Sequence, residues 1–226
     1  MPQLHRADDI ALLDLGDTEN RFSPSFVAEL ADCLEQVATS PPPCALVTVA
    51  TGKFWSNGLD LDWLGEHPEQ LDSYAGSVQA LLATVLTLPV PTVAAIQGHA
   101  FAAGAMLALA HDWRVMRADR GFFCLPEVDI QIPFTPGMDA LIRATLPHAT
   151  ALEAMTTGRR YGGVEAAAAG LVTEAVAEDA VRDAAVARVR PLAAKAGPTL
   201  ATIKARMHAA TVSALTAGEV SLPSPG

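Results

Sequence analysis

Two segments of this chain combine small residues with backbone turns in a way that suits catalysis. Residues 92–104 run from an apolar stretch through Gly98 into small residues and a helical pattern over 103–110. Small side chains let the backbone turn sharply and present bare N–H groups, and the positive end of a following helix favours a negative oxygen. Residues 44–62 repeat this pattern around Gly58. Two such turns predict an oxyanion hole with one N–H group from each, although close packing is the alternative interpretation of either turn.

A lone carboxylate is the candidate base. Glu127 lies within an apolar run, residues 122–130, directly after a proline. Burial there would raise its pKa, which suits a group that takes and returns a proton near neutral pH. Asp129 and Asp139 are weaker rivals, and the alternative for Glu127 is a turn residue that faces solvent. Burial of the carboxyl group decides between these interpretations.

Other known catalytic motifs are excluded because their residue types and spacing do not match this sequence. A phosphate loop needs Gly-Lys followed by Ser or Thr, whereas Ala and Met follow Gly104. A nucleophilic serine turn needs a glycine where Phe54 stands. His99 and His111 lie near an aspartate, but no His-Glu-x-x-His helix or Cys pair accompanies them, so we predict surface or capping histidines and no metal.

Composition limits the class of protein. Half of the 226 residues are hydrophobic, which is enough for a substantial core, and 15 Lys and Arg stand against 25 Asp and Glu. The resulting charge of −10 disfavours nucleic acid as a partner. The longest apolar stretch is too short for a bilayer, which takes about 20 residues. Three cysteines without metal-type spacing (Cys33, Cys44 and Cys124) and acids near the N-terminus favour a cytoplasmic protein with reduced thiols in its core.

The elements expected along the chain form an α/β protein. Apolar runs predict strands, helical spacing predicts helices, and a polar loop is expected over 65–73. From Thr135 onward the pattern is mostly helical, so this half should pack outside the sheet core. We expect a core over 1–192, a helical segment over 193–220 and a disordered tail over 221–226. The predicted strands are 10–15, 44–50, 92–96, 113–116 and 122–125, and the predicted helices include 25–38, 103–110, 149–157, 179–192 and 198–215.

Four ordered blocks resemble the crotonase superfamily, the enoyl-CoA hydratase and isomerase family. The likeness extends from about residue 10 to residue 192 and is carried by residues 54–61, 91–104, 111–116 and 123–130. It implies a spiral of repeated ββα units, with C-terminal helices that mediate subunit packing in a homotrimer or a dimer of trimers. It also implies an acyl-CoA substrate, with coenzyme A as part of that substrate and no other cofactor.

The resemblance also implies roles for particular residues. The N–H groups of Leu59 and Ala103 would hold the thioester oxygen, and Glu127 would be the acid and base. Many relatives have glycine at the position of Ala103, but alanine keeps the N–H group. Further residues expected to contact the substrate or its CoA portion are Lys53, Ser56, Asn57, Gly58, Asp60, Leu61, Gly98, Met106 and Lys204, the last in doubt because the C-terminal region is short.

Met106 narrows the expected chemistry. Hydratases of this family carry a second glutamate at this position, and a thioether cannot activate water. Moving a double bond needs only one base, which carries a proton from C2 to C4 through an enolate. The chain therefore resembles Δ3,Δ2-enoyl-CoA isomerases, especially those of the plant type. The alternatives are another enolate reaction on acyl-CoA, namely decarboxylation, thioester hydrolysis or hydration, and a non-catalytic acyl-CoA-binding subunit.

Overall fold

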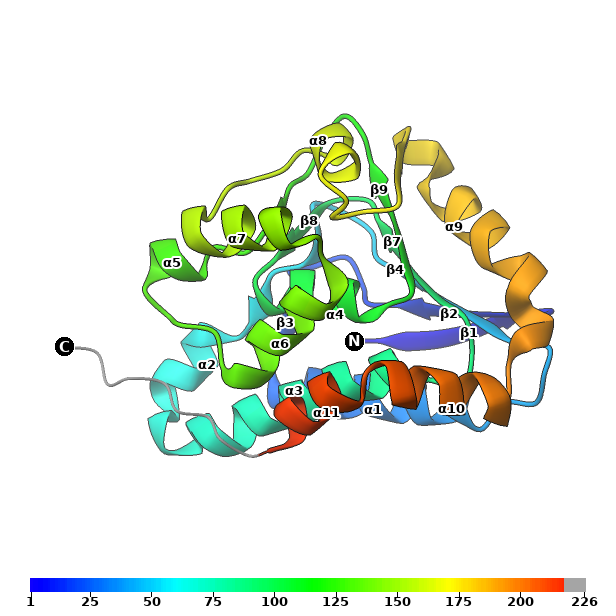
Figure 1. Ribbon diagram of the computed structural model, residues 1–226, viewed down its shortest axis with the longest axis horizontal. Coiled ribbons are helices and arrows are strands. Elements are labelled where there is room, and N and C mark those ends of the chain that lie inside the picture. The colour runs from blue at the N-terminus through cyan, green and yellow to red at the C-terminus, as the bar shows by residue number, and fades with distance from the viewer. Residues whose placement is uncertain (218–226) are drawn as a thin grey trace.

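A six-stranded sheet forms the centre of the computed structural model, which describes residues 1–217 (Figure 1). The strand order is β1-β2-β4-β7-β9-β11, with β1 antiparallel to β2 and the other pairs parallel. The bounds are β1 Gln3–Ala7, β2 Ile10–Asp14, β4 Ala45–Val49, β7 Thr92–Ile96, β9 Trp113–Arg117 and β11 Glu174–Val176.

Two smaller parallel sheets lie beyond the carboxyl ends of these strands. One has the order β10-β8-β5, and the other pairs β3 with β6. The chain repeatedly passes from a large-sheet strand to a small-sheet strand and then to a helix, which confirms the spiral of ββα units. The bounds are β3 Arg21–Phe22, β5 Phe54–Ser56, β6 Gly58–Leu59, β8 His99–Phe101, β10 Phe123–Cys124, α2 Leu61–Glu66, α4 Ala103–Ala110 and α5 Glu127–Ile130.

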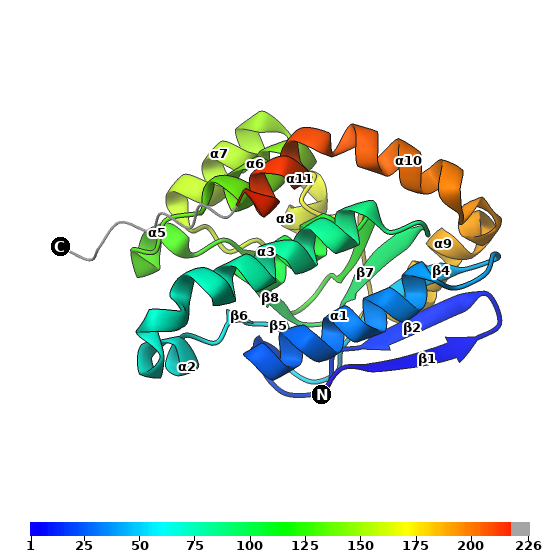
Figure 2. The same cartoon turned by 90° about the horizontal axis from the view of Figure 1, so that it is seen from below.

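Helices cover both faces of the large sheet. Figure 1 shows α9 (Val181–Val189) on one side of the sheet and α4 on the other. Alternate residues of β4 face these two layers: Val47 packs in the cluster that includes α9, and Leu46 packs in the larger core. Burial on both faces explains why the central parallel strands β4 and β7 are mostly apolar. Figure 2 shows α1 (Pro24–Ala38) and α3 (Leu71–Thr87) side by side, and their buried side chains belong to the larger core.

The first helix begins where the sequence predicts. Ser23 caps α1, since its side chain accepts the N–H of Phe26, and Pro24 occupies a first-turn position that needs no N–H partner. The buried side of α1 includes Cys33, and all three cysteines are buried free thiols, as expected. These local signals explain why this helix could be predicted within one residue.

Several sequence-based assignments were wrong. The predicted loop over 65–73 is mostly helical, because the Asp60 side chain caps α2 and a 3-10 turn, Pro68–Gln70, leads directly into α3. The single helix over 198–215 is two helices, α10 (Pro198–Met207) and α11 (Ala209–Thr216). Strand β11 was not predicted, since three residues are too few to show alternation. It pairs with β9 at the edge of the sheet.

The C-terminal helices fold back onto the chain's own core. α11 packs against α3 and against α6 (Pro136–Thr145), while α10 contacts α3. The subunit packing expected of these helices stays a prediction, and the predicted tail over 221–226 lies outside the described residues. Helices that complete the C-terminal half are α7 His148–Thr157 and α8 Gly163–Ala168, with 3-10 turns at Glu178–Ala180 and Arg190–Lys195.

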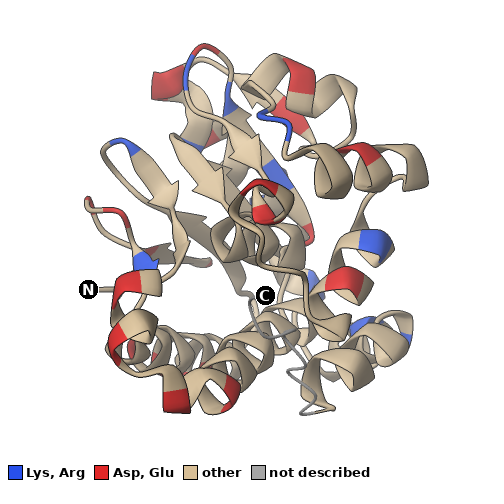
Figure 3. Cartoon of the chain, turned by 90° about the vertical axis from the view of Figure 1, so that its left-hand side faces the viewer, with Lys and Arg blue, Asp and Glu red and all other residues tan. Residues whose placement is uncertain are grey.

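The distribution of charged residues and the apolar length of the helices agree with the expectations from composition. On the face seen in Figure 3, the segments that carry Lys and Arg lie apart on different elements instead of forming one basic block. No helix within residues 1–217 is long and apolar enough to cross a bilayer.

Candidate active site

The first predicted turn presses directly against the second. Gly58 has φ +80°, a conformation that favours glycine, and a Cβ placed there would lie 2.9 Å from the amide nitrogen of Ala103. The same Cβ would lie 2.9 Å from the carbonyl oxygen of Phe101. Leu59 follows Gly58 along β6, so the structure brings the two predicted N–H donors into neighbouring turns.

Buried hydrogen bonds fix the shape of the first turn. The Ser56 hydroxyl is fully buried; it donates to the Asn20 carbonyl at 2.9 Å and accepts the Gly58 N–H at 3.2 Å. The Asn20 side chain in turn donates to the Trp55 carbonyl at 3.1 Å. Asn57 donates its backbone N–H to the Glu19 carbonyl. These bonds leave little freedom to the backbone that precedes Leu59.

The second turn begins helix α4. Ala102 has φ +49° and donates its N–H to the Cys124 carbonyl, which places Ala103 as the first residue of the helix. Met106 is the first residue whose N–H bonds to the Ala102 carbonyl, so the Ala103 amide precedes the helical ladder and points out of the helix end. A Cβ on Gly104 would lie 2.5 Å from the Ser56 carbonyl oxygen, so this glycine permits the close contact of the two turns.

Strand β10 leads to the candidate base, Glu127, from a position beside the second turn. Cys124 pairs with Phe101, and three residues later Glu127 begins α5. The Glu127 side chain is buried, with 6% of the residue exposed, which confirms the burial predicted from its apolar surroundings. Its Oε2 atom has no hydrogen-bond partner within residues 1–217. Burial raises the pKa of Glu127 to about 7. Near neutral pH this carboxyl group can therefore both accept and return a proton.

The raised pKa of Glu127 predicts a pH dependence of stability. Between about pH 4.5 and 7 the folded protein keeps this proton, whereas the unfolded chain releases it. The free energy of unfolding should therefore fall as pH rises through that window. Between pH 4 and pH 8 the wild-type protein should lose about 3 kcal/mol of its free energy of unfolding through the Glu127 carboxyl group. The Glu127→Gln variant, which has no ionisable group at this position, should not show this loss. Urea denaturation of both proteins from pH 4 to 8 measures this difference, and parallel curves would contradict it.

The rival acids lie elsewhere. Asp129 is exposed, and its carboxylate approaches Gly158 at the end of α7. Asp139 forms an ion pair with Arg143 on the surface of α6. Met106 is buried in the apolar core, 1% exposed, and supplies no carboxylate. Glu127 is thus the one of the three candidate acids that is enclosed.

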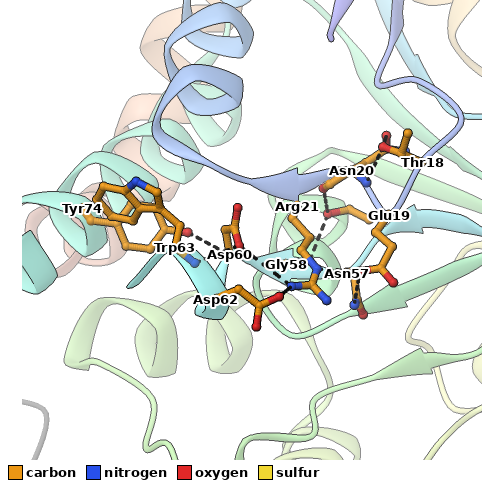
Figure 4. Close-up of polar contacts among 11 residues, drawn as sticks. Thr18, Glu19, Asn20, Arg21, Asn57, Gly58, Asp60, Asp62, Trp63 and Tyr74 are labelled. Atoms are coloured by element: carbon orange, nitrogen blue, oxygen red, sulfur yellow. Dashed lines mark hydrogen bonds and ion pairs between the residues drawn. The ribbon is translucent and has the colours of Figure 1, made fainter. Parts of the chain in front are cut away.

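An ion-pair network borders the first turn (Figure 4). Arg21, on the strand paired with β6, contacts Glu19 at 2.5 Å, Asp62 at 2.6 Å and Asp60 at 3.9 Å. Figure 4 shows Arg21 between these acids, with Tyr74 and Trp63 on the far side of Asp60. The Asp60 side chain also accepts the Trp63 N–H and so caps α2, while Leu61 is exposed.

Sequence reasoning missed three residues of this region: Asn20, Arg21 and Tyr74. Each acts through a partner distant in the sequence, so local patterns gave no sign of Arg21 or Tyr74. Asn20 has φ +48°, a conformation that asparagine tolerates, and its place in a polar turn is the one signal that could have marked it.

Lys53 and Gly98 lie at one cavity on the carboxyl edge of the large sheet. A Cβ on Gly98 would lie 2.3 Å from the Lys53 carbonyl oxygen, so their two loops touch. Lys53 is exposed, and its ammonium lies 5.1 Å from the centre of the Phe54 ring. The cavity measures about 550 Å³ and is lined by further cations, Arg120 and Arg182, as well as by the carboxylates of Asp14 and Glu178. The Lys53 side chain is therefore exposed to solvent at this cavity.

Lys204 is placed differently from the prediction. Its ammonium donates to the Asp112 carboxylate at 2.6 Å and to the Val90 carbonyl at 2.8 Å, and the residue is only 5% exposed. This buried ion pair ties α10 to the core, so the charge is not available to a CoA phosphate. Removing one partner of such a pair leaves an uncompensated buried charge.

The prediction for His111, a surface or capping residue, was correct only in part. It caps the C-terminus of α4 as predicted, but it is buried instead of lying at the surface. One ring nitrogen bonds the Leu107 carbonyl and the other lies 2.8 Å from the Thr48 hydroxyl. Burial lowers the pKa of His111 to about 3, so the ring stays neutral. Among residues 1–217, no three His, Cys, Asp or Glu side chains are grouped to hold a metal.

Comparisons with known proteins agree with the fold. "Enoyl-CoA delta isomerase 2, peroxisomal" of Arabidopsis thaliana is 38% identical and covers 92% of each chain. A probable enoyl-CoA hydratase of Mycobacterium tuberculosis is 39% identical over 76% of this chain and 66% of its own length. The crystal structure of human mitochondrial Δ3-Δ2-enoyl-CoA isomerase superimposes with a TM-score of 0.88 at 25% identity, covering 96% of this chain and 86% of the human one.

The family comparison covers nearly the whole chain. The enoyl-CoA hydratase/isomerase model matches residues 6–220, which include the strand–turn–helix units around Gly58 and Gly98 and the Glu127 segment. Its span therefore contains the two backbone turns and the enclosed carboxyl group described above. The chain belongs to the enoyl-CoA hydratase/isomerase family, within the crotonase superfamily.

Proposed function

We propose that this protein shifts the double bond of an enoyl-CoA from position 3 to position 2. One observation carries the proposal: Glu127 is an enclosed carboxyl group with a pKa of about 7 and one oxygen that has no hydrogen-bond partner among residues 1–217, while a buried methionine, Met106, stands where hydratases of the family carry a second acid. The Arabidopsis relative named as an isomerase supports the same reaction. Because the mycobacterial relative is named as a hydratase, the distinction needs a direct test.

The proposed mechanism uses one base and two N–H donors. Ionised Glu127 removes the proton on C2, and the electron pair of the broken C2–H bond spreads through a dienolate onto the thioester oxygen. The N–H groups of Leu59 and Ala103 donate to that oxygen and stabilise its negative charge. Protonated Glu127 then gives the same proton to C4, and the double bond ends between C2 and C3. The step consumes no water and no oxidant.

The CoA portion of the substrate would meet the loops around the first turn. Lys53 is the candidate cation for a phosphate, since its ammonium is exposed and other cations line the same cavity. Ser56, Asn57, Gly58 and Asp60 shape the backbone beside the thioester. We further propose the homotrimer or dimer of trimers expected of the family, in the cytoplasm. The exposed apolar side chains of Ile203 and Met207 on α10 support contact with a second copy.

Direct assay with two substrates tests the reaction. Purified protein given a 3-enoyl-CoA should increase the absorbance of the conjugated enoyl thioester without changing the substrate mass. A 2-enoyl-CoA should gain water slowly or not at all. Rapid hydration would contradict the proposal and the weight given to Met106. Loss of carbon dioxide or release of free CoA thiol would indicate the other enolate reactions, and thermal stabilisation by acyl-CoA without turnover would indicate a binding subunit.

A further inference from the structure

The Tyr74 hydroxyl lies between the two short strands that carry the first N–H donor. Tyr74 belongs to α3 and is 4% exposed. Its O–H donates to the Phe22 carbonyl at 2.6 Å and accepts the Asp60 N–H at 2.9 Å. Phe22 is paired with Leu59 across the β3–β6 ribbon, and Asp60 follows Leu59. One hydroxyl therefore bonds to the residue opposite Leu59 and to the residue after it.

The ribbon needs such support because it is very short. Each of its strands has two residues, and an isolated two-stranded ribbon is at best marginally stable. Gly58, directly before Leu59, has φ +80° and no side chain to restrict its backbone. The direction of the Leu59 N–H must therefore be set by contacts from outside the ribbon. Asp62 supplies one such contact through its ion pair with Arg21 of the ribbon, but the Arg21 side chain is one-third exposed, whereas Tyr74 is enclosed.

The Tyr74 ring is itself fixed in place. It packs against the Trp63 ring, with ring centroids 5.2 Å apart. The backbone N–H of Trp63 donates to the Asp60 side chain (Figure 4). Burial raises the pKa of Tyr74 to about 12, so the hydroxyl keeps its proton across the working range of the protein. It can therefore donate to Phe22 on β3 and accept from Asp60, directly after β6, at the same time.

We propose that Tyr74 is a positioning residue for the Leu59 half of the oxyanion hole: its hydroxyl sets the direction of the N–H group that meets the enolate oxygen. This inference rests on the proposed function, because it assigns Tyr74 to that same site. Oxyanion donors act only when they are aimed at the place where charge develops. A displacement of about 1 Å can cost about 10²-fold in rate.

A matched pair of variants tests the inference. Tyr74→Phe keeps the ring against Trp63 and removes both hydrogen bonds. Tyr161→Phe is the control, since Tyr161 is the other tyrosine of the sequence, is buried, and gives its hydroxyl to Glu153 away from the ribbon. We expect Tyr74→Phe to lower kcat by roughly 10- to 10²-fold with a smaller change in KM, because the donor acts mainly on the transition state. Tyr161→Phe should keep the wild-type kcat.

A spectroscopic measurement separates positioning from general stability. A saturated acyl-CoA, ¹³C-labelled at the thioester carbonyl, binds without reacting, and donors in the hole should lower its carbonyl stretching frequency. The shift should be smaller in Tyr74→Phe than in wild type, unchanged in Tyr161→Phe, and retained in Glu127→Gln. Wild-type kcat and the wild-type shift in Tyr74→Phe would overturn the inference, as would absence of the shift in wild type.

The outcomes distinguish the two proposals. A wild-type protein that shows the carbonyl shift but moves no double bond would refute the proposed activity while the Tyr74 comparison still stands. Hydrogen exchange of the wild-type protein adds a measurement that needs no folded variant. The Asp60 amide should exchange as slowly as the amides in the middle of α3, and rapid exchange would contradict the bond to Tyr74.

Discussion

Glu127→Gln should lose nearly all isomerisation of 3-enoyl-CoA, with kcat about 10²- to 10⁴-fold below wild type. Glutamine has nearly the same shape but cannot take the proton from C2. The CoA portion and the oxyanion hole are untouched, so the variant should still bind acyl-CoA. Steady-state kinetics together with thermal stabilisation by acyl-CoA measure the two effects. Undiminished isomerisation would refute the role of Glu127.

The same residue sets the expected pH profile. Only ionised Glu127 can remove the C2 proton, so kcat/KM should rise with pH and level off above about 7, the pKa of its carboxyl group. Asp129→Asn is the matched control, because it neutralises an exposed carboxylate two positions along the chain. We expect this control to keep both the rate and the pH profile. An equal loss in both variants would point to a general change in charge.

Gly58→Ala should cost about 10²- to 10³-fold in kcat, the effect of losing one oxyanion donor. The methyl group would lie 2.9 Å from the Ala103 amide nitrogen, and φ +80° is unfavourable for alanine. The turns must move apart to admit it, and both N–H donors lie at that contact. In this variant, kcat and the shift in the carbonyl stretching frequency of a bound saturated acyl-CoA should decrease together.

Gly76→Ala is the control for this substitution. Gly76 lies within α3, and a Cβ there would have nothing within 4 Å beyond its own helix. Alanine favours a helix over glycine by roughly 1 kcal/mol, so this variant should be slightly more stable and fully active. If Gly58→Ala kept the wild-type rate, the close contact of the two turns would have no part in catalysis.

The sequence was informative wherever function depends on neighbouring residues. Small residues that follow an apolar run predicted both turns, because only such residues allow a sharp bend with bare amides. The apolar neighbours of Glu127 made its burial one of two open interpretations, and the structure decided between them: Glu127 is buried although Val128 and Ile130 of the same run are exposed. Helical spacing over 25–38 likewise predicted α1 to within one residue of its observed start. The alternation of strands and helices predicted the class of fold.

The sequence was uninformative wherever a residue acts through a distant partner. Lys204 was expected to meet a phosphate, yet its charge is used by Asp112, 92 positions earlier. Tyr74 showed no pattern at all, although its hydroxyl reaches Phe22, 52 positions away. Burial of a charge or a hydroxyl depends on what packs above it, and that information lies in no local window.

The sequence by itself therefore indicated the chemical parts: two turns with small residues, one carboxylate within an apolar run and, through the family resemblance, a methionine where hydratases carry a second acid. Local backbone and hydropathy patterns indicate the turns and the carboxylate, whereas the meaning of Met106 rests on the resemblance. Only the tertiary structure decided that Glu127 is buried, that Gly58 presses against Ala103, that Lys204 is buried in an ion pair, and that Tyr74 bonds Phe22 and Asp60 beside the ribbon. Such contacts join segments far apart in the chain, and packing alone fixes their distances.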